Sequence, residues 1–174
     1  MTVAEPASNV LELLRQTTAA VFDMDGVLTD GTVLVTESGE EWRRMHVHDG
    51  YALQAALQGG MPVFVVSGGH SVGAELRLQR LGITACRMGV ADKGQALREL
   101  AQAYNLNLST TLYMGDDLPD AAALRLCGIP CCPADAAPQI QRLCIYVSRF
   151  KGGQGCVRDV LEKVLTLQHR WAEL

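Results

Sequence analysis

Basic residues are in the minority in this sequence, and no long apolar run is present. Lysine and arginine together number 15 against 19 aspartates and glutamates, which gives a formal net charge of −4. This balance disfavours nucleic acids and anionic membranes as main partners. No apolar run approaches the roughly 20 residues that span a bilayer, so we expect no membrane-spanning segment. Residues 1–15 contain two acids and no basic stretch ahead of an apolar run, which predicts a cytoplasmic protein without a signal peptide.

Aromatic residues are also few, but apolar residues as a class are not. Aromatics make up 5% of the 174 residues, whereas apolar residues make up 48%. A chain of this length buries about two-thirds of its unfolded surface, so we expect a single folded domain over residues 1–174. Six cysteines occur without a CxxC pair. This spacing is atypical of zinc sites, and we expect reduced, buried thiols rather than disulfides.

Short, unbroken apolar segments alternate with amphipathic ones along the chain. Such segments, rich in valine and isoleucine, are typical of strands that are buried on both faces of a parallel sheet. Strands are predicted at Ala19–Phe22, 62–66, 83–86, Thr111–Met114, Ile129–Cys132 and 145–147. Helices are predicted at 50–58, 71–81, 92–104, 118–127, 136–142 and 156–168. The alternation predicts an α/β fold, a three-layer doubly wound parallel sheet.

Two local features refine this prediction. Asp92 is expected to cap the N-terminus of the helix that follows it. The segment 32–47 breaks the alternation, because two strand-like runs flank the turn dipeptide Ser38-Gly39. This pattern predicts a β-hairpin inserted after the first strand.

Acidic and hydroxyl side chains follow the predicted strands at the point where each strand ends. In chain order, these residues and the loop glycine beside them are Asp23, Asp25, Ser67, Gly68, Asp116, Asp117 and Asp120. Lys93, one of only three lysines, opens a predicted helix between the last two groups. Doubly wound sheets bind ligands beyond the carboxyl ends of their strands, so we expect these residues to converge on one crevice.

The chemistry of this set points to a metal and a phosphoryl group. Several carboxylates in one cleft repel one another unless a cation lies between them, and a hard divalent ion such as Mg²⁺ is the natural partner of oxygen ligands. The metal and Lys93 would supply positive charge, while Ser67, Gly68 and backbone N–H groups would hold the oxygens of an anion. One carboxylate can then attack phosphorus, and a second can protonate the leaving alcohol and later activate water.

Four segments of the sequence together resemble a known family. They are 23–29 (DMDGVLT), Ser67-Gly68, Lys93 and 115–117 (GDD), and they resemble, in this order, the four motifs of the haloacid dehalogenase superfamily of phosphatases. The resemblance implies Asp23 as nucleophile and metal ligand, and Asp25 as general acid and base with its backbone carbonyl on the metal. It implies Asp116 as a further metal ligand, with Asp117 supporting the metal through water. Asp120 is expected either to stabilise the N-terminus of the predicted helix or to support the site. It also implies Ser67, Gly68 and Lys93 as phosphate-binding residues.

Further segments, including 39–41 (GEE), 46–51 (HVHDGY), 89–93 (GVADK) and 152–159 (GGQGCVRD), extend the likeness over nearly the whole chain from Val21. In these segments the sequence resembles one subfamily, the 3-deoxy-D-manno-octulosonate 8-phosphate phosphatases of lipopolysaccharide biosynthesis. Members of this subfamily lack a cap domain. The hairpin at 32–47 resembles their tetramerisation element, which implies a homotetramer in which a neighbouring subunit covers the site. The expected interface residues are Val33, Val35, Trp42 and Met45.

The substrate-binding residues are a separate set from the catalytic ones. The resemblance implies a set of substrate-binding residues, namely His46, His48, Asp49, Arg77 and Arg158. The subfamily usually has arginine where this chain has His48, Gln54 and Gly69, and a lost arginine removes a bidentate partner for a carboxylate. The substrate therefore stays open between the eight-carbon sugar-acid phosphate and a related nine-carbon keto-sugar phosphate. His46, His48 and Asp49 also allow a second interpretation, a metal-binding trio, while simple packing of His46 in the hairpin is a third.

Two other classes of function stay open at this point. A phosphoacceptor receiver domain also combines aspartates, a lysine, a hydroxyl residue and Mg²⁺ on a doubly wound sheet, although its acidic pair follows the first strand and its phosphorylated aspartate a middle one. A non-catalytic tetrameric assembly domain of the same superfamily is the other alternative. Phosphate release, or its absence in a protein that still assembles, would distinguish them.

Overall fold

The computed structural model of the protein describes residues 10–171, so most of the N-terminal segment considered above lies outside the described residues. Six strands form one parallel sheet in the order β5-β4-β1-β6-β7-β8. The strands are β1 (Ala19–Phe22), β4 (Val63–Val66), β5 (Cys86–Arg87), β6 (Thr111–Met114), β7 (Ile129–Cys132) and β8 (Tyr146–Val147). The chain builds outward from β1 through β4 and β5, then returns to the other side of β1 through β6. The strand order therefore reverses between β1 and β6, which is where doubly wound sheets bind their ligands.

Alternate side chains of the central strands enter two separate cores. Phe22 of β1 and Val65 of β4 pack into one core, whereas Val21 and Phe64 pack into the other. Every residue of β1, β4, β6 and β7 is buried. Because both faces of these strands are covered, their sequences are apolar apart from Thr111, and the prediction of a doubly wound sheet is confirmed.

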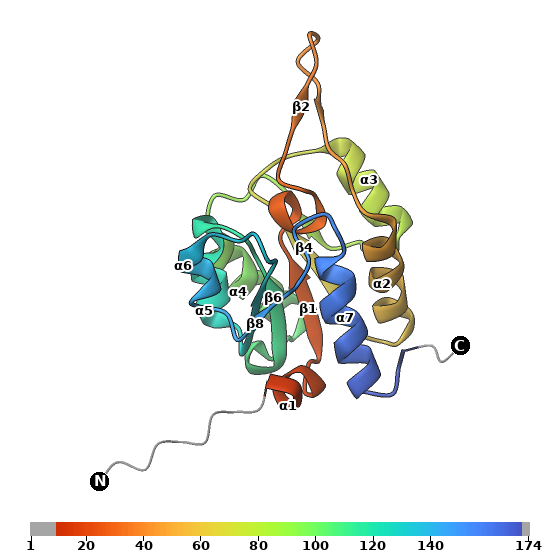
Figure 1. Ribbon diagram of the computed structural model, residues 1–174, viewed down its shortest axis with the longest axis vertical. Coiled ribbons are helices and arrows are strands. Elements are labelled where there is room, and N and C mark those ends of the chain that lie inside the picture. Colours follow the sequence, from red (N-terminus) through yellow and green to blue (C-terminus); the bar gives the residue numbers. More distant parts are fainter. Residues whose placement is uncertain (1–9, 172–174) are drawn as a thin grey trace.

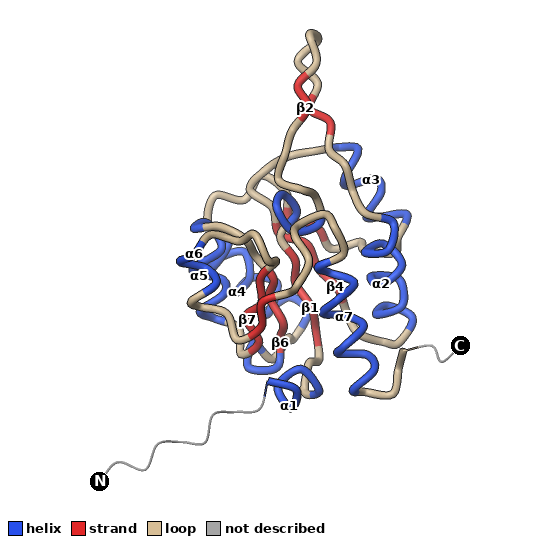
Figure 2. Tube along the Cα trace, viewed as in Figure 1, coloured by secondary structure: helices blue, strands red, loops and turns tan. Residues whose placement is uncertain are grey.

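Helices cover both faces of the sheet (Figure 1). They are α1 (Val10–Arg15), α2 (Val47–Gln58), α3 (Val72–Arg80), α4 (Lys93–Tyr104), α5 (Ala121–Leu126), α6 (Pro138–Gln141) and α7 (Cys156–Leu167). Helices α1, α2, α3 and α7 pack against the core that contains Phe22, and α4, α5 and α6 against the other. Figure 2 shows the resulting three layers, with the strands between the two groups of helices. In residues 10–171, no helix combines the length and apolarity that crossing a membrane requires.

The predicted hairpin is present and projects from the body of the molecule (Figure 1). Strand β2 (Leu34–Val35) pairs antiparallel with β3 (Glu41–Trp42), and Gly39 takes a positive φ of 82° in the turn. The paired strands occupy only part of the predicted hairpin segment 32–47, and Val47 already belongs to α2. In residues 10–171 this hairpin is the insertion between β1 and α2, and no cap domain is present.

Several boundaries differ from their predictions. Strand β5 begins at Cys86 rather than at 83, because Ile83 is fully buried in the turn ahead of the strand. Helix α2 begins three residues before the predicted start at Gly50, and the short helix α1 was not predicted. Asp92 caps α4 as predicted, since its side chain accepts a hydrogen bond from the backbone N–H of Gln95 at 2.9 Å.

Candidate active site

The two strands that flank the reversal of strand order bring Asp23 and Asp116 together. Phe22 and Met114 are register partners at the ends of β1 and β6, and the backbone N–H of Asp23 donates to the carbonyl of Met114 at 2.9 Å. Asp23 is the first residue after β1, and Asp116 is the second after β6. The parallel pairing of β1 with β6 therefore places residues 93 positions apart in the chain side by side.

A tight helical turn, η1 (Met24–Leu28), follows Asp23 and depends on Gly26. Gly26 has a φ of 87°, which side chains rarely adopt. A Cβ atom at this position would lie 2.0 Å from Oδ2 of Asp116. Glycine thus allows the loop after β1 to lie directly against the carboxylate contributed by β6.

Lys93, the first residue of α4, reaches into the same site. Its Nζ lies 2.8 Å from Oδ1 of Asp23 and 2.8 Å from Oδ1 of Asp120, and its side chain is 5% exposed. Burial by itself would lower the pKa of this amine, but the negative charges of Asp23 and Asp120 raise it above its usual value. Lys93 is therefore a buried ammonium group, positioned to hold an anion.

Asp120 organises the loop after β6 rather than standing free. Its Oδ1 also accepts a hydrogen bond from the hydroxyl of Tyr113 at 2.7 Å, and its Oδ2 accepts from the backbone N–H groups of Asp116 at 3.2 Å and Asp117 at 3.4 Å. The exposed Asp117 caps the short turn η3 (Leu118–Asp120) through the N–H of Leu118. Asp120 therefore orients both Lys93 and the Asp116 loop. Tyr113, which anchors it from inside β6, carried no signal in the sequence.

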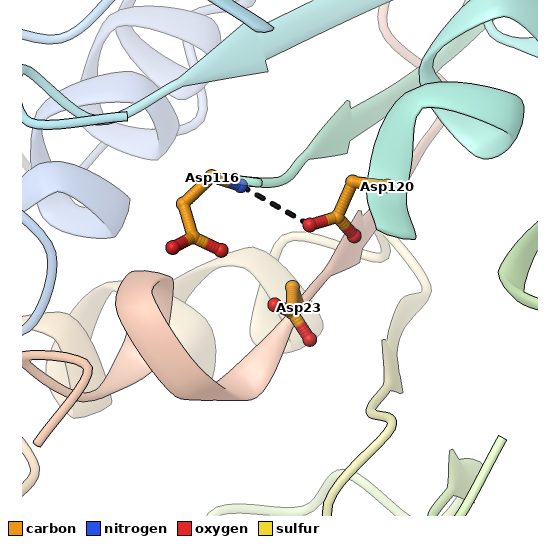
Figure 3. A group of neighbouring side chains, drawn as sticks. All are labelled: Asp23, Asp116 and Asp120. Carbon is orange, nitrogen blue, oxygen red and sulfur yellow. Dashed lines mark hydrogen bonds between the residues drawn. The ribbon is translucent and has the colours of Figure 1, made fainter. Parts of the chain in front are cut away.

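Asp23, Asp116 and Asp120 form a group that can hold a cation (Figure 3). Each offers a carboxylate oxygen within 4.8 Å of those of the other two. Burial and the charge of Asp120 raise the pKa of Asp23 to about 8 and that of Asp116 to about 6. Lys93 alone does not balance three carboxylates, so a divalent ion with oxygen ligands fits this set. Asp23 and Asp116 are the better ligands, because the oxygens of Asp120 are already engaged.

The phosphate-binding residues expected from the sequence lie at the same place. Ser67 follows β4, is 1% exposed, and accepts a hydrogen bond from the N–H of Gly69 through its Oγ at 3.1 Å. These residues and the acids line one hollow of about 250 Å³, called here the catalytic hollow. The predicted residues that line it are Asp23, Asp25, Ser67, Gly68, Lys93, Asp116, Asp117 and Asp120. The structure thus brings together every predicted catalytic, metal and phosphate-binding residue.

Asp25 has a partner that the sequence analysis missed. Arg43, from the segment after β3, donates from Nε to both carboxylate oxygens of Asp25, at 2.9 and 3.1 Å. The hydroxyl of Thr29 donates to Oδ1 of Asp25 at 3.2 Å. The ion pair with Asp25 raises the pKa of the Arg43 guanidinium. Arg43 lies 18 residues from Asp25 on an inserted hairpin, so only the position of the hairpin reveals the contact.

Arg77 lies in a second hollow beside the first. This hairpin hollow, of about 1030 Å³, lies between residues 39–45 and the start of α3, and Gly69 lines both hollows. Arg77 is in α3, and Arg43 forms part of the opposite wall. A phosphoryl group in the catalytic hollow would therefore have room for an organic group on the side of the hairpin.

The other predicted substrate-binding residues lie elsewhere in this chain. His46, His48 and Arg158 line a hollow of about 700 Å³ that shares no residue with the catalytic hollow. Asp49 is 1% exposed and accepts hydrogen bonds from the N-terminus of α7, including one of 2.6 Å from the N–H of Arg158. Asp49 thus caps a helix whose own cap residue, Gly155, has no side chain.

The interpretation of His46, His48 and Asp49 as a metal trio is not supported. Among residues 10–171, the group of Asp23, Asp116 and Asp120 is the one whose ligand atoms lie close enough to hold an ion. His46 and His48 flank the start of α2 with their rings in edge contact, 5.0 Å between centroids, rather than on one face of a strand.

Comparison with known proteins agrees with this geometry. Residues 88–158 match the family of haloacid dehalogenase-like hydrolases. The chain is 32% identical over 164 residues to the 3-deoxy-D-manno-octulosonate 8-phosphate phosphatase of Yersinia pestis, covering 94% of this chain and 88% of that protein. The crystal structure of the enzyme of this name from Moraxella catarrhalis, in complex with magnesium, phosphate and KDO, is 32% identical with a TM-score of 0.89 over 92% of each chain. A hypothetical protein of Xanthomonas campestris is 35% identical with a TM-score of 0.90, covering 95% and 91% of the two chains.

The similarity includes both the sheet and the segments that form the catalytic hollow. Identity above 30% over most of both chains excludes a likeness of fold alone. The chain therefore belongs to the haloacid dehalogenase-like hydrolases, as a phosphomonoesterase without a cap domain that resembles the 3-deoxy-D-manno-octulosonate 8-phosphate phosphatases.

Proposed function

We propose that this protein hydrolyses 3-deoxy-D-manno-octulosonate 8-phosphate in a Mg²⁺-dependent reaction that passes through an aspartyl phosphate on Asp23. The convergence of Asp23, Asp116 and Lys93 beyond the ends of β1 and β6 carries the proposal. The relatives of this name at 32% identity support the choice of substrate.

The side chains of the catalytic hollow divide the reaction between them. A carboxylate oxygen of Asp23 attacks phosphorus, while Lys93 and the Ser67 loop hold the phosphoryl oxygens. Asp25 gives a proton to the leaving sugar oxygen, and as a carboxylate it then takes a proton from the water that hydrolyses the aspartyl phosphate. A magnesium ion held by Asp23, Asp116 and the backbone carbonyl of Asp25 would add positive charge against the phosphoryl oxygens.

The hairpin hollow is the place we assign to the sugar acid. It adjoins the catalytic hollow at Gly69 and presents Arg77, a cation that suits a carboxylate. The absence of arginine at His48, Gln54 and Gly69 keeps a nine-carbon keto-sugar phosphate as a second candidate substrate. His46, His48 and Arg158 remain predicted substrate contacts, which in this chain would require a second subunit.

We also propose a cytoplasmic homotetramer assembled through the hairpin. Four side chains of the hairpin are exposed although they are apolar, namely Val33 at 40%, Leu34 at 63%, Val35 at 64% and Trp42 at 58%. Met45, by contrast, is half-buried against the core, so it is a weaker interface candidate than the sequence indicated. Sedimentation velocity of the protein and of a Trp42→Ser variant tests this assembly, and a wild-type monomer at micromolar concentration would contradict it.

Phosphate release across a panel of sugar phosphates, measured with and without Mg²⁺, tests the enzymatic proposal. We expect the eight-carbon sugar-acid phosphate to be hydrolysed with the highest kcat/KM and Asp23→Asn to show no turnover. Preference for a nine-carbon substrate would keep the phosphatase and change its substrate. A tetramer that hydrolyses nothing would favour the assembly domain instead, whereas membership of a hydrolase family already decides against the receiver interpretation.

A further inference from the structure

The hairpin contributes a buried cation to the residue assigned as the general acid. The Nε of Arg43 donates to both carboxylate oxygens of Asp25, and its Nη2 donates to Oε2 of Glu41 at 3.2 Å. The Arg43 side chain is 5% exposed and that of Asp25 is 30% exposed. A charge-assisted contact of this kind, largely removed from water, fixes the direction of a carboxyl group more firmly than a neutral hydrogen bond does.

The contact between Arg43 and Asp25 requires a residue without a side chain at position 69. A Cβ atom there would lie 2.9 Å from Oδ2 of Asp25 and 3.3 Å from Nη2 of Arg43. The ion pair therefore occupies the space that a side chain at position 69 would need. This chain has no arginine at position 69, and Arg43 brings a guanidinium from the hairpin to within 3.3 Å of the Cβ position of that residue.

The pair also stands at the boundary between the two hollows. Asp25 lines the catalytic hollow, Arg43 lines the hairpin hollow, and Gly69 lines both. In the proposed reaction the phosphoryl group occupies the first hollow and the leaving sugar the second. The ester oxygen that must be protonated then lies at the boundary, which is where Arg43 holds the carboxyl of Asp25.

We propose that Arg43 is a positioning residue, which fixes Asp25 so that its proton reaches the leaving oxygen. This inference rests on the proposed phosphatase reaction. As an oxygen of Asp23 forms its bond to phosphorus, the ester P–O bond breaks and its electron pair stays on the leaving oxygen. That oxygen takes the proton that Asp25 carries when the substrate is bound, which leaves Asp25 as the carboxylate that pairs with Arg43 in this structure.

Substrates that differ in their need for a proton test this role. A sugar alkoxide must be protonated as it leaves, whereas nitrophenolate is a stable anion without a proton. For Arg43→Met we expect kcat/KM to fall by about 10- to 100-fold with the eight-carbon sugar-acid phosphate and with ethyl phosphate. With p-nitrophenyl phosphate we expect a loss of less than about threefold, because kcat/KM reports only the steps up to formation of the aspartyl phosphate.

Matched variants separate positioning from folding. Arg44→Met removes the neighbouring arginine, which pairs with Asp30 at 2.6 Å and is 80% exposed, and it should leave both substrate classes unaffected. Arg43→Lys should restore part of the loss with alkyl phosphates. If Arg43→Met fails to fold, Gly69→Ala should produce the same split between alkyl and aryl substrates, because its methyl group presses on the Arg43–Asp25 contact.

Three results would overturn the proposal. Equal losses with alkyl and aryl phosphates would show a general structural role, and no loss with either would show no role. A loss confined to the sugar acid, with ethyl phosphate unaffected, would show that Arg43 binds the sugar rather than positioning Asp25. A wild-type protein that hydrolyses none of these phosphates would instead contradict the proposed function itself, and the role of Arg43 with it.

Discussion

Asp23 and Asp159 are both buried carboxylates, with 4% and 5% of their surface exposed, but their surroundings act in opposite directions. Asp159 of α7 accepts hydrogen bonds from the hydroxyls of Tyr146 at 2.5 Å and Ser148 at 2.8 Å, and it pairs with Lys163. Burial would raise the pKa of Asp159, but these three donors lower it below its usual value. Asp23 shares the one ammonium group of Lys93 with Asp120, and its pKa is raised.

The contrast indicates that Asp159 stabilises the fold, whereas Asp23 is available for the reaction. The contacts of Asp159 balance its charge within the chain and tie α7 to the end of β8. The aspartates of the catalytic hollow stay short of positive charge until a cation is bound. Strongly perturbed groups in a cleft are typical of functional sites, and the comparison predicts different consequences for changes at the two places.

The largest effect is expected from removing the nucleophile. Asp23→Asn should lower kcat by at least about 10⁴-fold, because an amide oxygen does not attack phosphorus. Asp159→Asn should keep kcat within about twofold, since Asp159 contacts no residue of the catalytic hollow. Steady-state phosphate release measures both, and comparable losses in the two variants would contradict the contrast.

The two lysines that pair with these acids offer the next test. Lys93→Met should lower kcat/KM by about 10²- to 10³-fold, because Lys93 is the buried cation that faces the phosphoryl group. Lys163, the partner of Asp159, is 40% exposed, and Lys163→Met should change kcat/KM by less than about twofold. A Lys93→Met enzyme with normal kcat/KM would show that the metal alone neutralises the phosphoryl oxygens.

Stability should show the reverse order. Asp159→Asn is expected to lower the free energy of unfolding by about 2 kcal/mol at pH 7, since three donors lose a charged acceptor. Because the folded pKa of Asp159 is lowered, its contribution is present above the unfolded pKa of about 3.9 and is lost as pH falls through the folded value. Urea unfolding of wild type and variant should therefore differ at pH 7 and converge below pH of about 4. A difference that persists at acidic pH would point to packing instead.

The smallest effect is the proton linkage of metal binding. The pKa values of Asp23 and Asp116, raised to about 8 and about 6, mean that proton binding favours the folded, metal-free state. That contribution is complete below the unfolded pKa and is lost as pH rises through about 6 and about 8. Mg²⁺ competes with these protons, so its Kd should weaken by up to about tenfold per pH unit for each proton displaced as pH falls.

Thermal unfolding with and without Mg²⁺ measures this linkage. The increase in Tm caused by Mg²⁺ should be greater at pH 8 than at pH 5.5. Asp116→Asn serves as the control, because it removes one titrating ligand and should flatten the dependence on pH. A Mg²⁺-induced shift that is the same at both pH values would show that the ion binds away from these aspartates.

Much of the fold and of the site could be predicted from the sequence because the relevant patterns are local. The residues of β1, β6 and β7 are buried on both faces and, apart from Thr111, are apolar, so the boundaries of these strands match the prediction. The acids and the hydroxyl residue follow such strands directly. The prediction placed the start of β5 at position 83 because Ile83 is apolar and buried, although it lies outside the strand. It placed the start of α2 at position 50 because residues up to 47 were assigned to the hairpin, whereas β3 ends at Trp42.

The sequence by itself determined which acidic and hydroxyl residues follow the strands. It also determined the chemistry that oxygen ligands, one lysine and a serine can perform together. Only the tertiary structure decided which groups touch. Parallel pairing of β1 with β6 set Asp23 beside Asp116, Tyr113 and Lys93 engaged Asp120, and the hairpin brought Arg43 to Asp25. The fold also brought Asp49 of α2 to the start of α7, where its carboxylate accepts a hydrogen bond from the backbone N–H of Arg158. Motifs are short-range patterns, whereas these contacts join residues that are distant in the chain and are set by how helices and hairpin pack on the sheet.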